Sequence, residues 1–81
     1  MTNAELIAWL EPQGYQNLRE LPDGYVVGTM ELIFTRAIFI GLNEWSFEKR
    51  FCFSDRELAL TELAKIQSVD DEPTGWVARR D

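Results

Sequence analysis

Residues 37–53 read AIFIGLNEWSFEKRFCF, and this stretch decides the fold. Residues 37–42 are an apolar run of β-branched and aromatic side chains, which is typical of a strand covered on both faces. Asn43-Glu44 supplies a turn, and residues 45–53 then alternate apolar with polar side chains, like an antiparallel strand with one buried face. The stretch therefore predicts a hairpin whose first arm lies inside the sheet.

The two arms of this hairpin should distribute their side chains differently. In the first arm, successive side chains point to opposite faces, with Ile38, Ile40 and Leu42 on one face and Ala37 and Phe39 on the other. In the second arm, the apolar face carries Trp45, Phe47, Lys49, Phe51 and Phe53, and the polar face carries Ser46, Glu48, Arg50 and Cys52. Because the first arm is apolar on both faces, both faces of the sheet need cover.

A second hairpin is expected upstream. Leu21-Pro22-Asp23-Gly24-Tyr25 combines Pro to set φ, Asp to bond the turn backbone and Gly to adopt a positive φ. Strands should flank this turn at about 17–21 and 24–30. Residues 30–36 either extend the second of these strands or form a short irregular connection.

Two capping boxes mark the starts of two helices. In each, a Ser or Thr side chain accepts from a backbone amide, and a Glu three residues later reaches back to the cap. They are Thr2 with Glu5, before an expected helix at residues 3–11, and Ser54 with Glu57, before an expected helix at residues 55–67.

The order of these elements predicts an α+β fold. A single small domain at residues 1–69 should run α-β-β-β-β-α, with an antiparallel meander of about four strands and both helices packed on one face. Residues 70–81 are interpreted as an acidic linker and a C-terminal tail. Trp76 of this tail is expected to fold back over the other face, and the alternative is that this face meets another subunit.

Composition argues against several kinds of chemistry. The chain has no histidine and a single cysteine, Cys52, so it lacks the commonest general base and the paired ligands of structural zinc sites. Asp70-Asp71-Glu72 lacks the alternating oxygen ligands and the glycine of a calcium loop. We therefore predict no enzyme activity, no cofactor and no metal site.

Charge and the N-terminal residues bear on partners and location. A net charge of -6 repels a phosphate backbone, which disfavours binding to nucleic acid. The first residues, Met1-Thr2-Asn3-Ala4-Glu5, carry neither a basic leader nor a long apolar run, so no secretion and no membrane span are expected. Together with the single cysteine, these features predict a cytoplasmic protein.

Several short motifs resemble a known group of sequences. They are Leu21-Pro22-Asp23-Gly24, Phe34-Thr35, Gly41-Leu42, Arg50-Phe51-Cys52-Phe53 and Glu72-Pro73-Thr74-Gly75-Trp76. This pattern is similar to short uncharacterised open reading frames of bacteria and their prophages. The resemblance implies a small phage- or prophage-associated protein, and it brings no catalytic residues because no activity is attached to that group.

Aromatic content, a two-faced strand and the lack of assembled chemistry favour a non-enzymatic protein that binds another protein, either an unidentified partner or a second copy of itself. The residues expected to contact the partner are Trp76, Arg79, Arg80 and Phe39. The alternative is an acidic modulator or mimic that acts on a nucleic-acid-processing machine, since Asp and Glu outnumber Lys and Arg by 14 to 8. That alternative requires carboxylates clustered on one surface, whereas the sequence spreads them.

Overall fold

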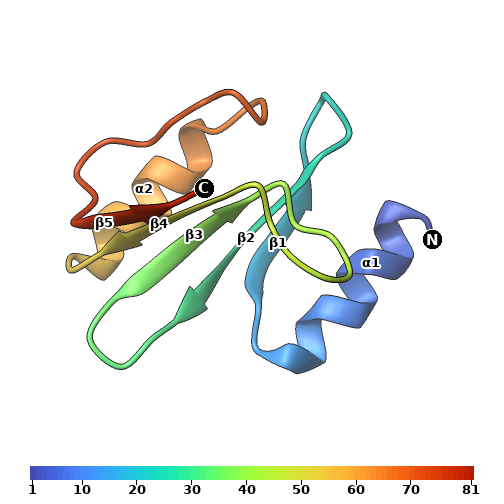
Figure 1. The fold of residues 1–81 in the computed structure, drawn as a ribbon, viewed down its shortest axis with the longest axis horizontal. Helices are drawn as coiled ribbons and strands as arrows, with labels where there is room; N and C mark the ends of the chain where they lie inside the picture. Colours follow the sequence, from blue (N-terminus) through green and yellow to red (C-terminus); the bar gives the residue numbers. More distant parts are fainter.

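The protein folds into a five-stranded sheet with two α-helices and one short 3-10 helix, in a computed structural model that describes all 81 residues (Figure 1). The elements in chain order are α1 (Asn3–Leu10), η1 (Glu11–Gln13), β1 (Gln16–Glu20), β2 (Val26–Glu31), β3 (Arg36–Ile40), β4 (Lys49–Phe53), α2 (Arg56–Lys65) and β5 (Ala78–Arg80). All neighbouring strands are antiparallel, in the order β1-β2-β3-β4-β5. The α+β class and the meander are confirmed. The sheet gains a fifth strand because residues 78–80 pair with β4.

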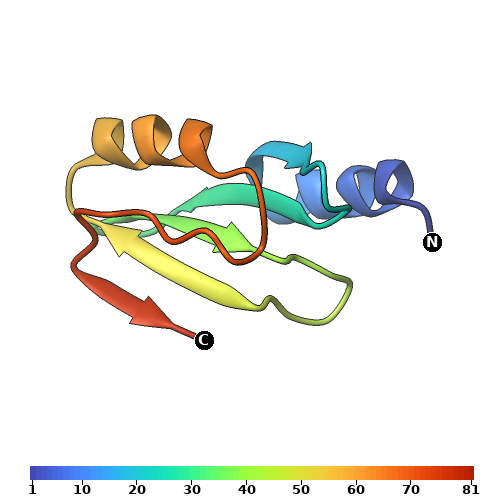
Figure 2. The same ribbon diagram turned by 90° about the horizontal axis from the view of Figure 1, so that it is seen from above.

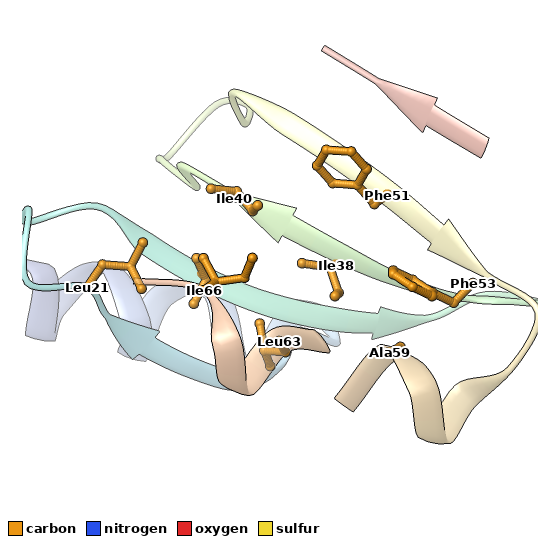
Figure 3. Close-up of a cluster of buried hydrophobic side chains, with 9 residues drawn as sticks. Leu21, Ile38, Ile40, Phe51, Phe53, Ala59, Leu63 and Ile66 are labelled. Atoms are coloured by element: carbon orange, nitrogen blue, oxygen red, sulfur yellow. The ribbon is translucent and has the colours of Figure 1, made fainter. Parts of the chain in front are cut away.

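One face of the sheet packs against α2. Figure 2 shows α2 lying along this face, and Figure 3 shows side chains of β3, β4 and α2 meeting there. This first cluster contains Leu21, Val27, Ile38, Ile40, Phe51, Phe53, Ala59, Leu63 and Ile66. Full burial of a large apolar side chain contributes about 1.5–3 kcal/mol, so this cluster is a main source of stability.

The alternate side chains of the same strands form a second cluster. Its members are Leu6, Leu10, Val26, Ala37, Phe39, Leu42 and Cys52. Val26 and Val27 are adjacent on β2 and enter different clusters, so the two clusters lie on opposite sides of the strands. α2 covers the first cluster, whereas α1, which lies beside β1 in Figure 1, adds its leucines to the second. The chain itself thus covers both faces of the two-faced strand.

The connection between β3 and β4 is longer than the turn predicted at Asn43-Glu44. β3 ends at Ile40, and Gly41 turns the chain with a φ of 75°. This left-handed conformation interrupts the period of two, so Leu42 enters the second cluster instead of sharing a face with Ile38. The expectation for Leu42 was therefore wrong.

The second arm of that hairpin is also shorter than expected. β4 begins at Lys49 rather than at residue 45. Trp45 lies in the connection and is 90% exposed, while Phe47 packs against the second cluster. Cys52, predicted on a polar face, is instead buried in the same cluster, between its register partners Ala37 on β3 and Ala78 on β5.

The predicted N-cap of α1 is confirmed, whereas the N-cap of α2 is a different residue from the predicted one. The capping box of Thr2 and Glu5 is present, with the Glu5 amide donating to Thr2 Oγ1 at 3.2 Å. For α2, the cap is Asp55 and not Ser54. Oδ1 of Asp55 accepts from the amides of Glu57 and Leu58 at 3.0 and 3.1 Å, and a carboxylate there also interacts favourably with the positive end of the helix dipole.

The stretch that the sequence left open, residues 30–36, forms a tight hairpin. β2 continues to Glu31, β3 begins at Arg36, and the Leu32 amide donates to the Thr35 carbonyl at 2.8 Å. The tip of this hairpin exposes Ile33 and Phe34, each by 85%.

Candidate functional site

The chain after α2 is fastened to the domain by a buried carboxylate. Glu62 is only 4% exposed, and its Oε1 accepts from the Thr74 amide at 2.8 Å and from Thr74 Oγ1 at 3.2 Å. Its Oε2 accepts from Lys65 Nζ at 2.7 Å. The Lys65 hydrogen bond, followed by the one from the Thr74 backbone, holds the pKa of Glu62 below its ordinary value. Glu62 thereby links α2 to the segment that leads into β5.

Beyond Thr74, two side chains pack the end of the chain against β4. The rings of Trp76 and Phe51 lie 5.8 Å apart at an angle of 54°. The guanidinium carbon of Arg79 lies 5.0 Å from the Phe51 ring centroid and 5.8 Å from that of Trp76. A cation over an aromatic face is attracted by the negative charge density of the ring. Trp76 and Arg79 therefore hold β5 in place. Because Phe51 belongs to the first cluster, Trp76 folds back onto the face that α2 covers and not onto the other face, where the sequence had led us to expect it.

The charge of Arg79 is already matched inside the protein. Its guanidinium forms ion pairs with Glu72 and Asp81, and the bond to Asp81 Oδ1 measures 2.8 Å. The hydrogen bond to Asp81 raises the pKa of Arg79 above its ordinary value, and the hydrogen bond to Glu72 raises it further. Arg79 consequently has little capacity left for a partner's carboxylate.

β5 is an edge strand with one free side. It pairs with β4 through three aligned residues, and the Val77 amide donates to the Cys52 carbonyl at 2.8 Å just before it. No strand lies on its other side, and all three of its residues are exposed. The outward backbone groups of an edge strand are a template for a further strand.

The opposite edge of the sheet is less suitable for pairing. β1 has an irregular register between Gln16 and Arg19, and Asn17 adopts a φ of 54°. A bulge of this kind disrupts the row of backbone groups and protects an edge strand. The free edge of β5 is thus the more regular of the two.

Only some of the Lys and Arg side chains of this acidic chain form ion pairs with carboxylates. Four form ion pairs, namely Arg36, Arg56, Lys65 and Arg79. Arg19 donates to the carbonyls of Leu63 and Ile66 at the end of α2, at 2.8 and 2.7 Å. The remaining three cations have no ion pair, and all lie on β4 and β5: Lys49, Arg50 and Arg80.

Two of these cations face each other across the strand pair. Arg50 and Arg80 are register partners, so their side chains leave the same face of the sheet. The Nε atom of Arg50 is buried and has no hydrogen-bond partner. A cationic pair without a counter-charge therefore stands next to the free edge of β5.

The structure brings together three of the four residues predicted to contact a partner. Trp76, Arg79 and Arg80 lie at this edge, with Trp76 still 38% exposed. Phe39 is 5% exposed and belongs to the core. Its ring makes edge-on contacts with Tyr15 and Phe47, with both centroid separations at 5.2 Å, so it offers no surface to a partner.

Arg50 is the member of this site that the sequence analysis missed. Its position on an alternating strand placed it on a solvated face, and nothing local marks it as unmatched. Only the strand pairing, which sets Arg50 opposite Arg80, identifies it.

Other exposed apolar side chains occupy separate parts of the fold. Ile33 and Phe34 lie at the β2–β3 tip, Trp45 lies in the β3–β4 connection, and Trp9 lies on α1. The structure has no pocket and no group of three potential metal ligands. Neither helix has the length and apolar character needed to cross a bilayer.

Comparison with protein-family models, curated proteins and solved structures finds no match to this chain. The edge of β5 and the side chains around it are therefore the features from which a function can be inferred.

Proposed function

We propose that this protein is a small, non-enzymatic interaction protein that binds an extended segment of another protein along the free edge of β5. The observation that carries the proposal is the pairing of β5, which is held to β4 on one side and has no neighbour on the other. Strand addition of this kind obtains affinity from backbone hydrogen bonds and specificity from alternate side chains.

The anchoring of β5 favours such binding. Glu62, Trp76 and Arg79 hold the strand in place before a partner arrives. A pre-ordered edge avoids much of the entropy loss that a disordered tail would undergo on binding. The exposed parts of Trp76 and Val77 lie immediately before the strand and add apolar contact area.

A second copy of the chain is a poorer occupant of this edge than a different protein. Pairing β5 with β5 of another copy would bring two Arg79-Arg80 segments together. Like charges on paired strands are destabilising. We therefore favour a partner of different sequence.

The acidic-mimic alternative receives less support from the positions of the carboxylates. Several of them bind the protein's own backbone or its cations: Glu5, Asp23, Glu31, Asp55, Glu62, Asp71 and Glu72. Carboxylates used in caps, turns and ion pairs are not free to imitate a row of phosphates.

The biological setting is part of the proposal. A cytoplasmic location is supported by the single, buried Cys52, which forms no disulfide. The association with phages or prophages rests on the sequence resemblance alone and stays a prediction.

Selection of peptides on the folded protein tests the proposed function. A display library of random linear peptides is selected on the immobilised full chain, and the selected peptides are titrated into ¹⁵N-labelled protein. We expect the largest amide shifts at residues 76–80 and around Cys52 on β4. The double variant Ile33→Ser/Phe34→Ser serves as the control and should bind equally well. Loss of binding in that variant, or shifts confined to the β2–β3 tip, would contradict the proposal.

A further inference from the structure

We propose that the segment accepted by β5 is acidic, and that Arg50 and Arg80 bind a carboxylate on it. This inference rests on the proposed function, because it specifies the chemistry of the strand that β5 accepts. It starts from the two arginines that stand opposite each other on β4 and β5 without a counter-charge.

The pair is unfavourable as it stands. Like charges on directly opposite strand positions repel each other. The buried Nε of Arg50 has lost its water and gained no acceptor, and it is the single buried side-chain polar atom in the chain without a partner. An anion placed beside Arg80, on the side away from β4, would offset the charge of both guanidinium groups and supply acceptors.

The fold places the pair where an added strand can reach it. On a strand paired with β5, the side chain opposite Arg80 leaves the same face as Arg80 and Arg50. The incoming side chain is the direct neighbour of Arg80, with Cβ atoms about 4.5–5.5 Å apart, a distance that a guanidinium can span to a carboxylate. Arg50 lies one strand further away, about 10 Å between Cβ atoms, and its long side chain can extend past Arg80 toward the same carboxylate. The incoming residue at that position should be Glu or Asp.

The next position on the added strand has a different environment. Its side chain lies on the face of Arg79, whose guanidinium is already paired with Glu72 and Asp81. An acid there would meet two existing carboxylates and gain nothing. The site therefore selects a carboxylate opposite Arg80 and an uncharged residue opposite Arg79, the next position along the added strand.

A peptide fits this site better than a nucleic acid strand does. The free edge of β5 offers backbone donors and acceptors in a row, and only another peptide backbone can pair with that row. The net charge of -6 also opposes a continuous polyanion, whereas one or two carboxylates meet the local cations.

Two matched peptides test the inference. Both are short, acetylated and amidated peptides of alternating Thr and Val, and they differ only by Glu or Gln at the central Thr position. Each is titrated into the ¹⁵N-labelled full chain at low salt. We expect the Glu peptide to bind about 3- to 10-fold more tightly, with shifts at β5 for both peptides. The ratio should fall as salt is added.

Three variants locate the effect. Arg80→Gln should bring the Glu:Gln affinity ratio close to one, and Arg50→Gln should lower the ratio to a smaller extent, because Arg50 lies one strand further from the incoming carboxylate. Arg56→Gln, which alters an ion-paired cation on α2, should leave the ratio as in the wild type. Loss of the ratio in Arg56→Gln as well would contradict a local site.

The outcomes separate this inference from the proposed function. Equal affinities of the two peptides at β5 would overturn the acidic preference and leave strand addition standing. A failure of both peptides to shift β5 would contradict strand addition, and the inference would fall with it. Tighter binding of oligo(dT) than of the Glu peptide, with shifts at Arg50 and Arg80, would assign the pair to phosphate instead.

Discussion

Glu62 on α2 accepts two hydrogen bonds from Thr74, twelve positions further along the chain, one from its amide at 2.8 Å and one from its hydroxyl at 3.2 Å. This contact joins a helix of the domain to the segment that precedes β5. If the edge of β5 is a binding surface, its readiness for a partner depends on this carboxylate.

The first prediction concerns removal of that carboxylate. Glu62→Ala leaves the Thr74 amide without its acceptor, and we expect a loss of about 1–3 kcal/mol in the free energy of unfolding. Amide hydrogen exchange at residues 78–80 should also become faster than the loss in the global free energy of unfolding alone would explain. Urea unfolding and hydrogen exchange measure the two effects. Glu44→Ala, an exposed turn residue, is the control and should change little.

The second prediction is a dependence of stability on pH. The pKa of Glu62 is lower in the folded protein than its ordinary value of 4.5, mainly because of the hydrogen bond from Lys65. A lowered folded pKa means that the stabilisation is complete above the unfolded pKa and is lost as the pH falls through the folded pKa. The free energies of unfolding of wild type and Glu62→Gln, measured with urea, should therefore differ most near neutral pH and become equal in acid. A difference that is the same at every pH would contradict this role.

The third prediction concerns the aromatic contact of the last segment. Trp76→Ala removes the ring that packs on Phe51 and lies beside Arg79, and we expect a loss of about 1–2 kcal/mol and a less ordered β5. Trp45→Ala is the matched control, because Trp45 is 90% exposed and should contribute less than about 0.5 kcal/mol. Chemical unfolding of both variants decides the matter, and equal effects would show that Trp76 does not hold the strand.

The fourth prediction tests the turn that ends β3. Gly41 has a φ of 75°, and a side chain there would also meet Glu48, with 2.8 Å to its Cβ. Gly41→Ala should therefore destabilise by about 2–4 kcal/mol from strain and overlap together. Gly24 has a φ of 88° and open space around it, so Gly24→Ala introduces backbone strain without overlap. It should lower the free energy of unfolding by only about 1 kcal/mol. Thermal or urea unfolding that gives the same loss for both would mean that Glu48 moves aside freely.

The sequence predicted those parts of the fold that depend on local patterns. The capping box at Thr2, the turn around Asp23-Gly24 and the apolar run at 37–40 each specify one conformation through neighbouring residues. The antiparallel meander follows from short connections between such strands.

The parts that the sequence did not predict depend on contacts between distant residues. β5 has only three residues and no apolar alternation, so its pairing with β4 leaves no local pattern. Phe39 was expected to reach a partner, but residues from α1 and the β3–β4 connection cover it. The importance of Arg50 arises from its alignment with Arg80, thirty positions away, which no local window contains.

We propose that β5 accepts another strand, and amide hydrogen exchange on the full chain tests this proposal. The exchange rates of the β5 amides are measured with and without a saturating peptide obtained from the display selection. We expect the outward-facing amide or amides among residues 78–80 to become strongly protected, while exchange at the β2–β3 tip stays as it was. Unchanged exchange throughout β5 in the saturated complex would contradict it.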